Sequence, residues 1–207
     1  MKTVTIIVAI IDDNLEQIRK CLSSIDKNLF EVIIACPTNC HPSIGEICND
    51  FTVFKIRTFS HTSIRNLWQQ GEKLSTTPWI VFIQSSDILT VQLQNNIDQG
   101  CGKFTPYNNY TYYLKRISIF LKRRLKYCHF WTGEPIPHIK FRHSVSSEGD
   151  NHGQPLGEAW PVPMGNLIHY GPETLSKVIT TAIFFMEEWA ENVFQKSPNL
   201  DKKTIFI

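Results

Sequence analysis

The sequence has no apolar run long enough to cross a membrane, and its six cysteines follow no regular spacing. A transmembrane helix needs about 20 mostly apolar residues, and no stretch approaches that length. The short apolar stretch after Met1-Lys2 lacks a small-residue cleavage site and leads into Asp12-Asp13. We therefore expect a buried strand there and not a signal peptide. These absences predict a cytoplasmic protein whose thiols are reduced.

The net charge of the chain is also small. The 207 residues carry a formal net charge of +2, which indicates no particular class of partner. Apolar content is ample, with 42% of residues hydrophobic against 19% charged, and this is typical of a globular chain with one sizeable core. The sequence contains no internal repeat, no low-complexity tract and no clear domain boundary, which favours a single domain over residues 1–207.

The first half of the chain alternates between predicted strands and helices. The β-branched apolar run Thr3–Ile11 is typical of a parallel strand that is covered on both faces. Further strands are predicted at Glu31–Ala35, Thr52–Ile56 and Trp79–Ile83, and a helix at Thr62–Leu74. Apolar residues at helical spacing predict another helix, through Leu15, Ile18, Leu22 and Ile25. This alternation predicts a layered α/β domain with a Rossmann-like first half.

Shorter elements are predicted in the second half. They are a helix at Thr90–Gln99, strands at Asn108–Tyr113 and His138–His143, and a loop at Ser144–Gly157. Pro172 suits the first turn of a long amphipathic helix. The apolar face of that helix would consist of Leu175, Val178, Ile179, Ala182, Ile183, Met186, Trp189 and Val193.

Residues 114–126 combine apolar positions at helical spacing with six basic residues. The cations are Lys115, Arg116, Lys122, Arg123, Arg124 and Lys126. Three interpretations stay open: a solvated helix face, a helix on an anionic membrane surface, and a nucleic-acid-binding stripe, for which a basic run alone is weak support. We expect no nucleic acid, and we predict peripheral contact with the inner face of the membrane through Leu114–Lys126.

The strand predicted at Trp79–Ile83 stops abruptly in the polar run Gln84-Ser85-Ser86-Asp87. Ligands of open α/β sheets bind just beyond the carboxyl ends of strands, so this run predicts a binding site. The alternative is a polar loop in which Asp87 caps the helix at Thr90.

Several segments, in the same order, resemble family 2 glycosyltransferases. The centre of that family is similar to FSHTSIRNLWQQGEKLSTTPWIVFIQSSDIL, and its opening to TIIVAIIDDNLEQIRKCLSSI. Three later segments resemble bacterial envelope sugar transferases, such as those of lipopolysaccharide cores: YYLKRISIFLKRRLKYCHFWTGEPIPHIKFR, GDNHGQPLGE and NLIHYGPETLSKVI. The resemblance implies a single GT-A domain with a mixed, mostly parallel sheet between helices. Its nucleotide-binding half would be 1–100, and its acceptor half, ending in a helix, 101–207.

The resemblance also implies an activity: transfer of a sugar from a nucleotide-sugar donor of the UDP type to a saccharide or lipid-linked acceptor. In this family a carboxylate deprotonates the acceptor hydroxyl, and a metal with nearby cations stabilises the leaving diphosphate. The two spaced aspartates that hold this metal correspond to Gln84 and Ser86. Because Mg²⁺ and Mn²⁺ prefer carboxylates, we predict weak metal binding through Asp87 alone. Gln84 and Ser86 would bond to ribose or phosphate.

Other donor contacts are implied at matched positions. Asp12 and Asp13 would meet the base or ribose, or else cap the following helix. Thr38 would meet the base. Arg65 would meet the diphosphate, unless it forms an ion pair on the helix surface. His169, matched by the closing His of the family, would face the diphosphate or serve as a structural residue.

Catalytic candidates come from the segment around GDNHGQPLGE, where Gly153 replaces a glutamate of the family. Glu148, Asp150 or Glu158 would supply the base, and the alternative for each is a place in a solvated loop. His152, which the family also has, is a further catalytic candidate. A zinc site is a further alternative, built from Cys36, Cys40, His41 and Cys48.

Two other functions stay open besides the enzyme. One is a catalytically degenerate relative that binds a partner or a sugar nucleotide without turnover, which the altered acidic positions favour. The other is a basic scaffold at the membrane surface.

Overall fold

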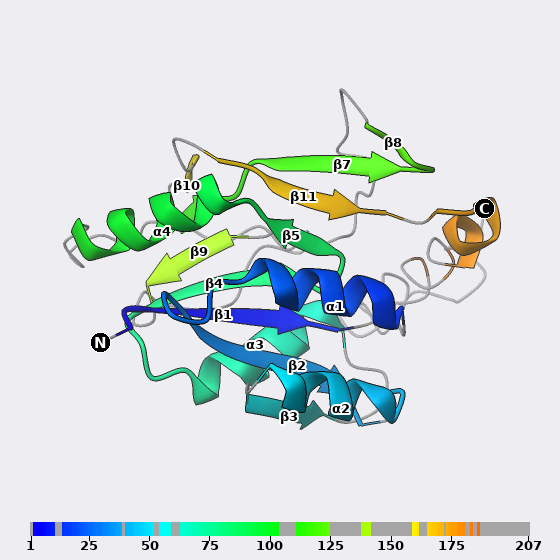
Figure 1. Cartoon of the computed structure of the whole chain (residues 1–207), viewed down its shortest axis with the longest axis horizontal. Helices are drawn as coiled ribbons and strands as arrows, with labels where there is room; N and C mark the ends of the chain where they lie inside the picture. Colours follow the sequence, from blue (N-terminus) through cyan, green and yellow to red (C-terminus); the bar gives the residue numbers. More distant parts are fainter. Residues whose placement is uncertain are drawn as a thin grey trace, which may run out of the picture.

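Two β-sheets and their covering helices make up the computed structural model of the chain (Figure 1). The structure describes residues 2–10, 14–38, 40–51, 54–58, 63–103, 111–124, 138–141, 159–161, 165–171 and 173–180, together with 183 and 186. The helices are α1 (Leu15–Ser24), α2 (Ser43–Asp50), α3 (Ile64–Leu74) and α4 (Val91–Lys103). The strands are β1 (Val4–Ala9), β2 (Glu31–Pro37), β3 (Phe54–Thr58), β4 (Trp79–Gln84), β5 (Asp87–Leu89), β6 (Thr111–Tyr113), β7 (Arg116–Phe120), β8 (Arg123–Arg124), β9 (His138–Phe141), β10 (Ala159–Pro161) and β11 (Leu167–Tyr170).

Seven strands form the main sheet, in the order β10-β6-β9-β4-β1-β2-β3. Strands β4, β1, β2 and β3 are parallel, whereas β9 is antiparallel to its neighbours β4 and β6. The second sheet has the order β5-β11-β7-β8. Because β5 follows β4 after the turn at Ser85 and Ser86, the carboxyl end of a central strand leads directly into the second sheet.

Strand β1 lies at the centre of the core, and all six of its side chains are buried. Val4, Ile6 and Val8 pack in a cluster with residues of α1, α2 and α4, while Ile7 and Ala9 pack with α3 on the opposite face. Alternate side chains of a strand point to opposite faces, so both faces of the sheet are covered. The predicted α/β architecture, a mixed and mostly parallel sheet between helices, is confirmed.

The elements predicted in the first half are present, with small shifts at their ends. Strand β3 begins at Phe54, two residues later than predicted. Helix α3 begins at Ile64 because the Ser63 hydroxyl accepts the Asn66 N–H at 3.2 Å, as a helix N-cap does.

The second half contains three predicted elements and part of a fourth. α4, β6 and β9 occupy predicted segments, and residues 175–180, 183 and 186 are helical, as the amphipathic pattern predicts. On this last helix Leu175, Ile179, Ile183 and Met186 are 46–67% exposed. Within the described ranges, no helix is long and apolar enough to span a bilayer.

The helix expected over residues 114–126 is wrong for the part that the structure describes, which is a β-hairpin. Strands β7 and β8 pair antiparallel, and both turn residues between them, Leu121 and Lys122, have positive φ (46° and 62°). Two such residues are typical of the tight turn that matches strand twist. Strand β7, whose sequence alternates, also pairs with β11. Packing against neighbouring strands decides strand formation more than helical spacing of a few apolar residues does.

Gly71 marks the closest approach of α3 to the sheet. A Cβ at this position would lie 2.5 Å from Cγ2 of Ile7, a buried β-branched side chain with little freedom to turn away. We expect Gly71→Ala to lower the free energy of unfolding by about 1–3 kcal/mol, since overpacking outweighs the helix preference of alanine, about 1 kcal/mol. Urea denaturation measures this.

The control is Gln70→Ala, at the neighbouring exposed position of the same helix. It should leave the free energy of unfolding within about 0.5 kcal/mol of the wild-type value. An unchanged or higher stability of Gly71→Ala would contradict the close packing of α3 on β1.

Candidate functional site

A cluster of polar side chains lies where β4 ends. β4 pairs with β1 on one side and β9 on the other, so its carboxyl end is central in the sheet. Gln84 is the last residue of β4, Ser85 and Ser86 form the turn, and Asp87 begins β5. The predicted position of this run, at the carboxyl end of a central strand, is confirmed.

The Asp87 carboxylate is the centre of the cluster and is fully buried. Its Oδ2 accepts the backbone N–H of Gln84 at 2.8 Å. Its Oδ1 accepts a hydrogen bond from Arg116 Nη2 at 3.3 Å and lies 2.9 Å from His169 Nδ1. Both oxygens therefore have partners within the protein. The alternative of Asp87 as a helix cap is wrong, because Thr90 Oγ1 accepts the Leu93 N–H at the start of α4.

Charge and burial act in opposite directions on Asp87. Burial by itself raises the pKa of this carboxyl, but the positive charge of Arg116, the contact with His169 and the Gln84 N–H together hold the pKa below its ordinary value of 3.8. The group is therefore an ionised carboxylate paired with a guanidinium at neutral pH.

His169 has three polar neighbours at one ring nitrogen. Besides Asp87 Oδ1, its Nδ1 contacts Arg116 Nη2 and lies 3.2 Å from the Ser86 hydroxyl. A protonated Nδ1 donates to Asp87, whereas a bare Nδ1 accepts from Arg116. This contact brings His169 to Asp87, while the assignment of both residues to the diphosphate stays a prediction.

Register in the second sheet brings these residues together. Asp87 stands opposite His169 in the β5–β11 pair, and Arg116 stands opposite Leu167 in the β11–β7 pair. Leu167 and His169 are two residues apart, so both point to one face of the sheet. Arg116 thus reaches the pair from the same face.

The start of β11 is anchored against α4. Gly165 has φ 94°, and a Cβ there would lie 2.5 Å from the Leu93 Cα, so only glycine fits. Thr90 Oγ1 donates to the carbonyl of Asn166 at 2.9 Å and accepts the Asn166 N–H at 3.3 Å. At the other end of β11, the Tyr170 N–H donates to the Ser86 carbonyl at 2.8 Å.

Arg116 is the residue of the cluster that the sequence patterns do not single out. Helical spacing over residues 114–126 places it among the surface cations. The signal that identifies it is the two-residue alternation of Arg116, Ile117, Ser118 and Ile119, which places Arg116 and Ser118 on one face of a strand.

Gln84 contributes a buried amide to the cluster. Its side chain is 5% exposed, and Ser86 Oγ donates to its Oε1 at 3.4 Å. Its Nε2 is buried and has no hydrogen-bond partner. A buried N–H without a partner costs about 1–3 kcal/mol, so this donor is a candidate for bonding to a ligand.

These residues do not fit a divalent cation. Gln84 and Ser86 are neutral, and Asp87 is buried with both oxygens bonded inside the protein, whereas Mg²⁺ and Mn²⁺ need accessible carboxylate oxygens. Among the described residues, no group of three His, Cys, Asp or Glu side chains is placed to hold a metal ion.

The zinc alternative gains no support from this region. Cys36 and Cys40 bring their sulfur atoms to 3.5 Å, while His41 Nδ1 accepts the N–H of Ser43. The side chain of Cys48 lies outside the described residues.

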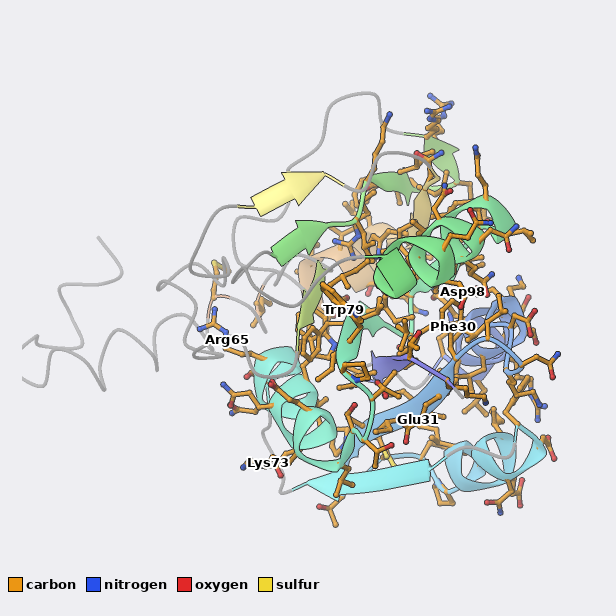
Figure 2. All side chains as sticks on the ribbon, turned by 90° about the vertical axis from the view of Figure 1, so that its left-hand side faces the viewer. Phe30, Glu31, Arg65, Lys73, Trp79 and Asp98 are labelled. Atoms are coloured by element: carbon orange, nitrogen blue, oxygen red, sulfur yellow. The ribbon has the colours of Figure 1, made fainter. Side chains whose placement is uncertain are left out.

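Two other residues that are predicted to contact the nucleotide-sugar donor lie at the ends of elements. Thr38 is exposed and directly follows β2. Arg65 is in the first turn of α3, and Figure 2 shows it at the opposite end of that helix from Lys73. One turn later, Trp68 Nε1 donates to the Ile83 carbonyl at 2.8 Å, which anchors the start of α3 beside the end of β4.

Five predicted site residues lie outside the described part of the chain. They are Asp12, Asp13, Glu148, Asp150 and His152, and their assigned roles stay predictions. Glu158, the other candidate base, lies outside it too.

Comparison with known proteins identifies the fold. No family model matches the sequence, and no curated protein matches it. Among solved structures, the chain is similar to the crystal structure of S. aureus TarS 1-349, with a TM-score of 0.53 and 11% sequence identity. The match covers 99% of this chain and 68% of that chain. TarS is a family 2 glycosyltransferase, so the fold of this chain is GT-A-like.

The buried charge pair makes stability depend on pH. Because the folded-state pKa of Asp87 is lowered, the unfolded chain binds more protons in acid. This contribution is present above the ordinary pKa of 3.8 and is lost as pH falls through the folded value below it. We expect Asp87→Asn to lower the free energy of unfolding by about 3 kcal/mol at pH 7, since it leaves Arg116 without its carboxylate. Thermal unfolding between pH 7 and acid measures both effects.

Asp50→Asn is the matched control, because Asp50 forms an exposed ion pair with Arg19 at 3.4 Å. It should change stability by less than about 1 kcal/mol. Equal effects of the two substitutions, or an Asp87→Asn protein that loses as much stability in acid as the wild type, would contradict the paired carboxylate.

Proposed function

We propose that this protein is a glycosyltransferase that binds a nucleotide-sugar donor, of the UDP type, at the carboxyl ends of β1, β2 and β4. The observation that carries the proposal is the polar cluster of Gln84, Ser86, Asp87, Arg116 and His169 at the end of a central strand in a GT-A-like sheet. Ligands of open α/β sheets bind at this edge. The acceptor would be a saccharide or a lipid-linked saccharide, as in transferases of the bacterial envelope.

Each described residue has a role in this proposal. Thr38 meets the base, since it follows β2 and is exposed. Ser86 and Gln84 bond to ribose or phosphate, and His169 faces the diphosphate. Arg65 approaches from the start of α3. All of these groups bind and orient the donor.

The chemical step is an inverting displacement. A carboxylate among Glu148, Asp150 and Glu158 removes the proton of the acceptor hydroxyl. The acceptor oxygen forms a bond to the anomeric carbon as the bond from that carbon to the diphosphate breaks, and the diphosphate leaves with the electron pair. Asp12 and Asp13 would contact the base or ribose.

A degenerate relative that binds a sugar nucleotide without turnover is the second candidate. One observation favours it: both oxygens of Asp87 are used inside the protein, so the acidic residue retained at the motif has a structural partner instead of a metal. Hydrolysis or transfer of the bound donor separates the two candidates.

Nucleotide binding is tested by thermal unfolding with UDP, in EDTA and in Mn²⁺. Ligand at 100 times its Kd stabilises the native state by about 2.7 kcal/mol, so we expect Tm to rise by roughly 5–10 °C. ADP, which has another base, and uridine, which lacks the diphosphate, are the controls. Each should raise Tm less than UDP does. If no nucleotide raises Tm in either condition, the proposed function is wrong. Release of UDP from a UDP-sugar then distinguishes enzyme from binding protein.

An anionic membrane surface is the partner we propose for the turn and second strand of the β7–β8 hairpin, which are exposed. Leu121 at its turn is 40% exposed, and Lys122, Arg123 and Arg124 are exposed beside it. Each cation near an anionic surface contributes about 1 kcal/mol, so Lys122→Gln with Arg123→Gln should weaken binding to phosphatidylserine vesicles roughly 30-fold. Vesicle sedimentation at low salt measures this.

Lys73→Gln is the control, because Lys73 is exposed on α3, across the molecule from β8 (Figure 1). It should leave vesicle binding unchanged. Equal binding to neutral and anionic vesicles, or no binding to either, would exclude the membrane surface as the partner of the hairpin.

A further inference from the structure

We infer that the site binds a diphosphate without a divalent metal, and that Arg116 supplies the positive charge. The inference rests on the proposed function, because the diphosphate is that of the nucleotide-sugar donor. It begins from the misfit of a cation to Gln84, Ser86 and Asp87, which removes the usual source of positive charge at this edge of the sheet.

Within the charge pair, Asp87 is more deeply buried than Arg116. The side chain of Asp87 is 0% exposed, and that of Arg116 is 20% exposed. An anion that approaches the pair therefore meets the guanidinium, while the carboxylate lies behind it. Guanidinium groups are always charged and match phosphate oxygens in geometry.

The polar groups around the pair include hydrogen-bond donors. Gln84 Nε2 is a buried donor without a partner, and the Ser86 hydroxyl lies 3.4 Å from Gln84 Oε1 and 3.2 Å from His169 Nδ1. A hydroxyl can rotate its hydrogen from these neighbours to a ligand. Phosphate oxygens accept hydrogen bonds and carry negative charge, so they match these donors. A metal ion would instead need oxygen ligands with free electron pairs, which N–H donors do not supply.

The position of Arg116 is set by strand pairing. Backbone pairing of β7 with β11, and of β11 with β5, carries Arg116 to the carboxyl end of β4 from a strand 32 residues away in sequence from Gln84. The ion pair with Asp87 and the contact with His169 then orient the guanidinium before any ligand arrives. A preoriented cation loses little conformational freedom on binding.

The experiment is isothermal titration of the full chain with UDP and with inorganic pyrophosphate, in EDTA and in Mn²⁺. We expect both ligands to bind in EDTA, with Kd values that change less than about threefold in Mn²⁺. Arg116→Gln should weaken both ligands by about 10- to 100-fold, the range for a hydrogen bond to a charged group. Arg116→Lys should give an intermediate loss, because the charge stays and the planar fork is lost.

A second variant separates the binding role from the structural one. Arg116→Gln alone leaves Asp87 buried without its cation and can lower stability. Arg116→Gln with Asp87→Asn removes both charges of the pair, and binding is then compared per folded molecule. Arg123→Gln is the control for loss of an exposed arginine on the neighbouring strand β8, and it should bind both ligands as the wild type does.

The outcomes divide as follows. Binding in EDTA that the double variant loses and Arg123→Gln keeps supports the inference. Binding of UDP only in Mn²⁺, or binding in EDTA that Arg116 variants retain, overturns it and leaves the proposed function standing. If UDP binds in neither condition, the proposed function fails. Pyrophosphate binding that depends on Arg116 would then still support the anion site, and its absence would overturn that too.

Discussion

The structure of the site depends on one buried carboxylate. Asp87 receives hydrogen bonds from the end of β4 and from β7, and its side chain contacts that of His169 on β11. Removing an ionised group from water is costly unless its partners replace the lost hydrogen bonds. The chain therefore places a backbone N–H, a guanidinium and an imidazole around this group. These contacts connect the carboxyl end of β4, in the main sheet, to the second sheet.

This use of Asp87 changes what the site can bind. In the resembled family, carboxylates at this edge face a metal, and the metal faces the diphosphate. Here the carboxylate faces inward and the guanidinium stands nearer to solvent. Of the two charged groups, the one nearer to a ligand is then a cation. Under the proposed function, Arg116 would take the place of the metal at the diphosphate, with Gln84 and Ser86 standing at the two acidic positions of the family.

Elements whose position depends on neighbouring residues in the sequence were predictable. The buried strand at Val4–Ala9 and the polar end of β4 follow from periodicity and from abrupt changes in polarity. The strand β5 and the position of Arg116 were not predictable in this way, because both depend on pairing with β11, whose residues lie about 50 to 80 positions away. The spacing of Leu114, Ile117 and Leu121 predicts a helix where the structure has a strand and a turn. A few apolar positions can fit the helical and the strand period alike.

The anchoring of β11 also sets which parts of the chain can change in length. Gly165 and Asn166 are held against α4, and His169 follows only a few residues later. An insertion or deletion of one residue between these points would turn the imidazole to the other face of the sheet. A change in length upstream of Gly165 would leave that register intact. The chain before Gly165 can therefore vary in length without moving His169, whereas the spacing from Gly165 to His169 is fixed.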